Sequence, residues 1–188
     1  ETRAFFTARG YREVETPALV PAPGAEVHLR AFATRYEAHL GQGVSRDLWL
    51  RTSPELALKR LLVAGAGPVF ELARVWRNGE ISPRHAPEFT MLEWYRPGLG
   101  FAGLMTETEE FIRAVAPPIV AHGDVTTDLS LPFERITMAE AFARWCNGLD
   151  ILGTEGDTAR LHAAAQAAGF TPHADEGWED LFFRLLLE

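Results

Sequence analysis

The feature that most constrains this fold is the segment of residues 68–97, which contains two strand-like stretches separated by a polar loop. Both stretches are rich in β-branched and aromatic side chains that alternate with a period of two, the pattern of a half-buried strand. The loop between them contains the turn-forming residues Asn78, Gly79, Ser82 and Pro83. The sequence therefore predicts an antiparallel hairpin with Glu80, Arg84 and His85 at its tip.

One face of the predicted hairpin carries an unusual set of side chains. They are Arg77 at the end of the first strand and, alternating along the second, Phe89, Glu93 and Tyr95. A guanidinium binds phosphate or carboxylate through two hydrogen bonds, an aromatic ring can stack a nucleobase, and a carboxylate beside a hydroxyl can hold an ammonium group. The set is typical of a pocket for a nucleotide and an amine. The structural alternative is a half-exposed sheet with an ion pair between Arg77 and Glu93.

The stretch RNGEISPRHAPEFTMLEWYRP resembles the second signature motif of class II aminoacyl-tRNA synthetases, in the form found in lysyl-tRNA synthetases and their relatives. The likeness is specific because RN, RH, PEFTM and ExY occur together at fixed offsets. Three features, EWYRP, TSPE followed by KRLL, and GPVF before the strand, are most similar to a family of lysyl-tRNA synthetase paralogues. Those paralogues are ligases that attach (R)-β-lysine to translation elongation factor P. The resemblance predicts a catalytic-domain fragment of that ligase family.

A second segment, residues 47–65, combines a short strand with the start of a helix. Ser53, Pro54 and Glu55 match helix-start chemistry: a hydroxyl cap, a proline in the first turn and an acid near the positive end of the helix dipole. Capping alone explains the three residues, and binding of a ligand ammonium group at the same helix start is compatible with it. The resemblance implies the second role as well, because it places Ser53, Pro54 and Glu55 at the amino-acid site.

The first twenty residues predict a short helix that ends at Gly10 and a strand closed by Pro17. This arrangement resembles the first class II motif, which forms the dimer interface in that family, so we expect a homodimer. The alternative is an edge strand, since proline cannot donate to a β-ladder. Further along, VHLRAF resembles a short strand of the ligases where lysyl-tRNA synthetases have a glycine-rich GGA segment.

The predicted fold class is α+β: a class II aminoacyl-tRNA synthetase-like antiparallel sheet flanked by helices, incomplete at both ends. Residues 1–116 are expected to form the N-terminal part of the catalytic core, with the first and second motifs. Residues 117–188 are expected to be a helical continuation of the same domain, truncated before the third motif, with the best candidate for a joint at 117–127. Capping signals and apolar spacing predict helices over residues 101–116, 137–145 and 157–168.

The resemblance implies a two-step reaction. The carboxylate of lysine or β-lysine attacks the α-phosphate of ATP, and a lysine side chain of elongation factor P captures the aminoacyl-adenylate. Arg77 is implied as the catalytic residue, and the implied ATP-binding residues are Arg77, Asn78, His85 and Phe89. The implied substrate-binding residues are Ser53, Pro54, Glu55, Glu93 and Tyr95. Mg²⁺ is expected with ATP, and no metal ligand is assigned within the chain because the carboxylates that bind it are expected beyond residue 188.

Two positions depart from the family pattern. Gly79 stands where the family usually has Glu directly after RN, and Ala86 stands where it has Asn after the His. The contacts to the adenine edge are therefore open. Glu80 is a candidate replacement, through a shift of the loop by one residue.

The net charge of the chain argues against a nucleic acid as its binding partner. Eighteen basic and 26 acidic residues give a net charge of −8, which disfavours extended contact with a nucleic-acid backbone, so tRNA is not expected as a partner. No run of about 18 apolar residues is present to span a membrane, and no secretory signal opens the chain, so a cytoplasmic location is expected. The single cysteine, Cys146, excludes an internal disulfide.

Two alternatives to the ligase stay open at this level: a catalytic fragment of a lysyl-tRNA synthetase, and a catalytically inactive synthetase-like binding module. The sequence contains no GxxxGxxR-like third motif with its catalytic arginine. We therefore expect residues 1–188 alone to be inactive. The side chains that suit lysine also suit β-lysine, so the sequence does not separate the two substrates.

Overall fold

The predicted hairpin is confirmed in the computed structural model of the chain. Its strands are β5 (Val69–Trp76) and β6 (Glu88–Tyr95), which pair antiparallel along their whole length. The structure describes residues 1–24, 26, 29–38, 43 and 45–187. Residues 27 and 28 of the VHLRAF segment therefore lie outside the described residues.

The expectation of a single antiparallel sheet needs correction. β1 (Arg12–Glu13) pairs with β5 in parallel, which gives a mixed sheet of order β1-β5-β6. The long crossover between the two strands permits this parallel pairing. That crossover contains a second, antiparallel sheet of order β2-β4-β3, and a hairpin of β7 and β8 forms a third. The bounds of these strands are β2 (Leu19–Val20), β3 (Ala33–Glu37), β4 (Ser45–Leu50), β7 (Ile119–His122) and β8 (Val125–Asp128).

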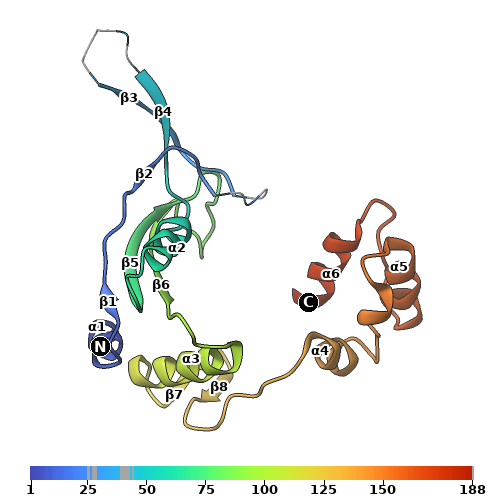
Figure 1. Ribbon diagram of the computed structural model, residues 1–188. Coiled ribbons are helices and arrows are strands. Elements are labelled where there is room, and N and C mark those ends of the chain that lie inside the picture. The colour runs from blue at the N-terminus through green and yellow to red at the C-terminus, as the bar shows by residue number, and fades with distance from the viewer. Residues whose placement is uncertain (25, 27–28, 39–42, 44, 188) are drawn as a thin grey trace. The chain divides into compact units, whose positions relative to one another are not determined.

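Three helices accompany these strands, and all three were predicted from the sequence. α2 (Glu55–Val63) packs against β5 and β6, and α1 (Thr2–Ala8) packs against α3 (Phe101–Val115), as can be followed in Figure 1. An aromatic cluster binds the helices to the sheet: the ring of Phe6 is fully buried and stacks on Phe70 at 4.9 Å between centroids. The buried carboxylate of Glu107 in α3 accepts hydrogen bonds from Tyr11 and, at 3.2 Å, from Arg96. These contacts fix the end of β6 from which Tyr95 projects.

The contacts within the chain divide it into two compact units, residues 1–131 and 132–188. The sequence placed the division at 116/117, fifteen residues earlier. The difference has a local cause, because Arg113 at the end of α3 donates from Nε to the carbonyl of Leu129 at 2.7 Å and from Nη2 to that of Leu131 at 2.5 Å. Residues 117–131 are thereby tied to α3 in the first unit.

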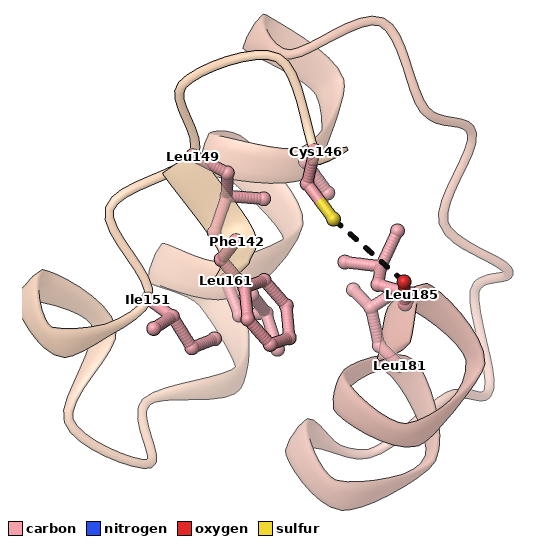
Figure 2. Packing of buried hydrophobic residues seen from close by; sticks show 8 residues of the cluster. Phe142, Cys146, Leu149, Ile151, Leu161, Leu181 and Leu185 are labelled. Carbon is pink, nitrogen blue, oxygen red and sulfur yellow. Dashed lines mark hydrogen bonds between the residues drawn. The ribbon is translucent and has the colours of Figure 1, made fainter. Parts of the chain in front are cut away.

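The second unit is helical. It contains α4 (Met138–Trp145), the 3-10 turn η1 (Leu152–Thr154), α5 (Thr158–Ala167) and α6 (Trp178–Leu187). Thr137 and Glu140 form a capping box at the start of α4, and the Asp157 side chain caps α5, so both predicted helix starts are confirmed. Figure 2 shows the core of this unit, where the thiol of Cys146, the residue directly after α4, points at the carbonyl of Leu185 in α6, 3.7 Å away. Burial raises the pKa of that thiol.

No helix in the described ranges combines the length and the apolar character needed to cross a bilayer.

Candidate active site

The carboxylate of Glu93 is the centre of a hydrogen-bonded cluster on the face of β6. The hydroxyl of Ser53 donates to its Oε1 at 2.5 Å, and the hydroxyl of Tyr95 donates to its Oε2 at 3.0 Å. Among the described residues, Glu93 makes no ion pair with Lys, Arg or His. Its negative charge is therefore met by two neutral donors.

The start of α2 brings Ser53 to this cluster. The helix begins at Glu55, and the Ser53 hydroxyl accepts a hydrogen bond of 3.0 Å from the backbone N–H of Glu55 while donating to Glu93. One side chain thus contacts both the first residue of the helix and the carboxylate on β6, while the N-cap position itself is Pro54. Binding of a ligand ammonium group at this helix start stays a prediction. Pro54 is fully buried, and Glu55 forms an ion pair with Lys59 one turn along the helix.

Tyr95 links Glu55 to the same cluster. Burial is the main cause that raises its pKa above the ordinary 10.0, followed by the charge of Glu93, the hydrogen bond to Glu93 and the charge of Glu55. The phenol therefore stays protonated and donates its hydrogen bond throughout the physiological pH range. Ser53, Glu55, Glu93 and Tyr95 form one electrostatic unit.

A second carboxylate lies directly opposite Glu93. Glu71 of β5 pairs in register with Glu93 of β6, so the two project from the same face of the hairpin. Glu71 is neutralised by Arg51, whose Nη2 lies 2.8 Å from Glu71 Oε1, and Thr16 Oγ1 donates to Glu71 Oε2 at 2.7 Å. Sequence reasoning missed all three residues. The signal was a Glu placed between Val69 and Ala73 on a face of a strand that is otherwise apolar.

Of the residues predicted to bind the nucleotide, the structure brings Arg77 and Phe89 together. The guanidinium carbon of Arg77 lies 5.2 Å from the centroid of the Phe89 ring, and the backbone N–H of Arg77 bonds to the carbonyl of Pro87 at 2.9 Å. The alternative ion pair with Glu93 is not formed, since Arg77 Nη1 faces Glu80 Oε2 at 3.8 Å. Its Nε atom is buried and has no hydrogen-bond partner in the described part of the chain. A guanidinium with an unused donor beside an aromatic ring is suited to an anionic ligand.

The other two residues predicted to bind the nucleotide, Asn78 and His85, lie at different places in the loop. The backbone N–H of Asn78 donates to the carbonyl of Arg30 at 2.7 Å, which fixes the loop base beside Arg77. His85 is exposed, and its Nδ1 lies 2.7 Å from the hydroxyl of Ser82. No contact among the described residues brings His85 to Arg77 or Phe89. Gly79 has a φ of +88°, a conformation that favours glycine over the Glu usual in the family.

A cavity of about 430 Å³ opens beside the start of α2. Its lining includes Arg51, Ser53, Pro54, Glu55 and Arg60. Arg77, Phe89, Glu93 and Tyr95 do not line it. The cavity therefore borders the Ser53 and Glu55 side of the candidate site, which is the side predicted to bind an amine. The concavity expected to join Arg77, Phe89 and Glu93 is not part of it.

The side chains of His, Cys, Asp and Glu in the described ranges do not gather in any group of three or more that could hold a metal ion. Magnesium, which was expected with ATP, therefore finds no donor set among these residues.

The sequence that forms this helix start and hairpin lies within a match to a known family. Residues 1–177 match the profile of the family described as tRNA synthetases class II (D, K and N). The chain belongs to that family of class II synthetases. The resemblance drawn from the second motif is confirmed at this level.

The curated relatives that match are more specific. The chain is 40% identical over 179 residues to the elongation factor P–(R)-β-lysine ligase of Pseudoalteromonas translucida, a match that covers 95% of this chain and 48% of the relative. It is 48% identical over 120 residues to the ligase of the same name from Haemophilus influenzae strain PittGG, covering 63% of this chain and 37% of the relative. A third, from Erwinia tasmaniensis, is 40% identical over 169 residues, which is 90% of this chain and 47% of the relative. The chain thus spans half or less of the length of these relatives.

Proposed function

We propose that this chain contains the first two motifs of an ATP-dependent ligase. The ligase activates lysine or β-lysine as an aminoacyl-adenylate and transfers it to a lysine side chain of elongation factor P. The observation that carries the proposal is the state of Glu93, a carboxylate with two hydroxyl donors and no cationic partner among the described residues. A site of this kind suits a ligand that brings its own positive charge. The names of the relatives support the same substrate and acceptor.

The two ends of the site lie on one face of one strand. Phe89 and Glu93 are four residues apart on β6, which corresponds to about 13 Å along a strand. That span leaves room for an extended amino acid between a phosphate bound at Arg77 and an ammonium group bound at Glu93. In this proposal Ser53 and Tyr95 orient Glu93, Pro54 fixes the helix start, and Glu55 takes the amino group nearer the substrate carboxylate.

The nucleotide end performs the first step by positioning charge. An oxygen of the substrate carboxylate attacks the α-phosphorus of ATP, and pyrophosphate leaves with the electrons of the broken P–O bond. Arg77 bridges the attacking carboxylate and the α-phosphate, where negative charge gathers, and Phe89 stacks the adenine. Asn78 fixes the base of the loop and His85 reaches the outer phosphates, which requires the exposed loop tip to move toward the ligand. A carboxylate is already ionised, so this step needs no general base.

In the second step the amine of the acceptor lysine attacks the carbonyl carbon of the adenylate. AMP leaves, an amide bond forms, and the proton of the amine passes to solvent. The net charge of −8 supports a protein acceptor over tRNA, because extended contact with a phosphate backbone draws on basic surface. A homodimer formed through the first motif and a cytoplasmic location belong to the same proposal.

The test is ATP–pyrophosphate exchange by the full-length protein, measured with α-lysine and with β-lysine in turn. We expect exchange that depends on one or both of these amino acids, followed by labelling of elongation factor P. Labelling of tRNA instead would identify the alternative, a lysyl-tRNA synthetase. Absence of exchange with both isomers would identify the second alternative, an inactive binding module.

A further inference from the structure

Two carboxylates lie opposite each other across the hairpin, and only one of them, Glu71, has a cationic partner among the described residues. Glu71 and Glu93 are direct partners in the β5–β6 register, a position in which side chains leave the backbone on the order of 5 Å apart. Like charges directly opposite one another destabilise a sheet. The structure avoids this repulsion by neutralising one of the two.

Glu71 is the neutralised partner. It and Arg51 are almost fully buried, with side-chain exposures of 2% and 5%, and their atoms Oε1 and Nη2 lie 2.8 Å apart. The remaining donors of Arg51 are also used: Nη1 bonds to the carbonyl of Thr16 at 2.8 Å and Nε to the carbonyl of Arg74 at 3.0 Å. A buried ion pair with its hydrogen bonds completed in this way is a closed, neutral unit.

Arg51 also lies at the boundary of the candidate site. It lies two residues before Ser53 and lines the cavity beside the start of α2. Its backbone carbonyl accepts a hydrogen bond of 3.0 Å from the N–H of Trp76, next to Arg77. The pair is therefore almost fully buried, and its Arg51 borders the cavity beside the start of α2.

We propose that the Arg51–Glu71 pair determines the specificity of the site for a cationic substrate, because it leaves Glu93 as the one unneutralised carboxylate of the two. Arg51 is a positioning residue that acts through Glu71. This inference rests on the proposed function, since it assumes that the amine of the substrate binds at Glu93. Its consequence is that the charge balance of the buried pair controls binding of the amino acid and leaves binding of ATP unchanged.

The single change Glu71→Gln removes one charge and leaves Arg51 as an unpaired buried cation beside Glu93. That cation attracts the Glu93 carboxylate and repels the substrate ammonium. We expect affinity for lysine to fall by roughly 10- to 100-fold, with affinity for ATP within about 2-fold of the parent. The double change Arg51→Met with Glu71→Gln removes both charges at similar volume, and we expect it to restore lysine affinity to within about 3-fold.

The experiment is calorimetric titration of the full-length protein with lysine, β-lysine and ATP, together with the unfolding temperature of each variant. The control is Arg74→Met, which breaks the exposed ion pair of Arg74 with Glu88 on the opposite face of the same hairpin and should change neither affinity. If Glu71→Gln does not fold, the double variant decides: it removes both charges together, so its lysine affinity should stay within about 3-fold of the parent, and a loss above about 10-fold would overturn the inference.

Two results would overturn the inference: equal losses of lysine and ATP affinity in Glu71→Gln, or lysine affinity of the double variant that stays more than about 10-fold below the parent. Each would mean that the pair supports the fold and does not set the charge of the site. Failure of the proposed function is recognised separately, because the parent itself would then bind neither lysine nor β-lysine, and the inference would fall with it.

Discussion

The hydroxyl of Ser53 donates a hydrogen bond of 2.5 Å to the carboxylate of Glu93, across 40 positions of sequence. The same hydroxyl accepts a hydrogen bond from the backbone N–H of Glu55, the first residue of α2, so one side chain contacts both the start of the helix and the acid on β6. A displacement of the helix start would therefore move the carboxylate that we assign to the substrate ammonium. This coupling makes Glu93 the first residue to test.

Glu93→Gln should lower affinity for lysine, because the amide keeps the shape and loses the charge that pairs with the ammonium group. A charged hydrogen bond of this kind is worth about 1.5–3 kcal/mol, or roughly 10- to 150-fold in affinity. Titration with lysine and ATP measures it, and ATP binding should not change. The matched control is Glu88→Gln on the opposite face of β6, where an exposed acid pairs with Arg74. Equal affinities for Glu93→Gln and the parent would contradict the assignment of the amine end.

Arg77→Ala should slow adenylate formation by about 100-fold or more, the effect of deleting one donor worth about 3 kcal/mol at a site of developing negative charge. The reason lies in the geometry, since its guanidinium lies 5.2 Å from the Phe89 ring centroid and has an unused buried Nε–H. Pyrophosphate exchange by the full-length protein gives the rate. Arg84→Ala on the exposed loop is the control, and a comparable loss there would argue against a special role for Arg77.

Glu80→Ala tests whether this loop compensates for Gly79. Glu80 is the carboxylate beside Arg77, with 3.8 Å between Oε2 and Nη1, and it is the candidate to replace the Glu that the family usually has directly after RN. Its removal should weaken ATP binding by roughly 5- to 10-fold, the loss of one modest polar contact. Calorimetric titration with ATP measures this change in affinity. An unchanged ATP affinity rejects the one-residue shift of the loop.

The parts of the fold that could be predicted are those determined by residues close together in the sequence. The β5–β6 hairpin follows from a period of two interrupted by Asn78 and Gly79, and the start of α4 follows from the Thr137–Glu140 capping box. β7 was missed because it follows directly on Pro117 and Pro118, where the sequence indicates a turn. The parallel pairing of β1 was missed because nothing local specifies which strand lies beside it.

In the candidate site too, only the residues that lie near one another in the sequence could be grouped in advance. Side chains on one strand, such as Phe89, Glu93 and Tyr95, could be grouped by alternation alone. The Thr16–Glu71 hydrogen bonds join residues 55 positions apart, and they depend on the parallel pairing of β1 with β5, which places the residues after β1 beside Glu71. The assignment of His85 to the phosphates stays a prediction, because a loop tip has no such pattern to locate it.

In the second unit, Leu161→Ala should destabilise the fold by about 2–5 kcal/mol, the usual cost of removing a fully buried leucine side chain and leaving a cavity. Leu161 has 0% exposure and lies in the core drawn in Figure 2. Chemical denaturation followed by circular dichroism gives the free energy. Leu152→Ala is the matched control, since that leucine is 66% exposed and its truncation should cost less than about 0.5 kcal/mol.

The stability of the second unit should depend on pH through the carboxyl of Glu176. The Arg184 guanidinium binds both oxygens of Glu176, at 2.5 and 2.8 Å, and is the main cause that lowers the pKa of this carboxyl from 4.5 to about 2. Because the pKa is lower in the folded state than in the unfolded state, the ion pair stabilises the fold fully above pH 4.5, and this stabilisation is lost as the pH falls toward about 2. Arg184→Met should move the titration midpoint of Glu176, followed by carboxyl NMR, up toward 4.5.

The same variant should also flatten the dependence of stability on pH in this window, since the folded and unfolded states then bind the proton alike. Arg144→Met is the control, because it breaks an exposed pair with Glu134 and leaves the partner of Glu176 in place. A Glu176 midpoint that stays near 2 in Arg184→Met would show that another donor, such as the backbone N–H of His173 at 2.7 Å, dominates the shift.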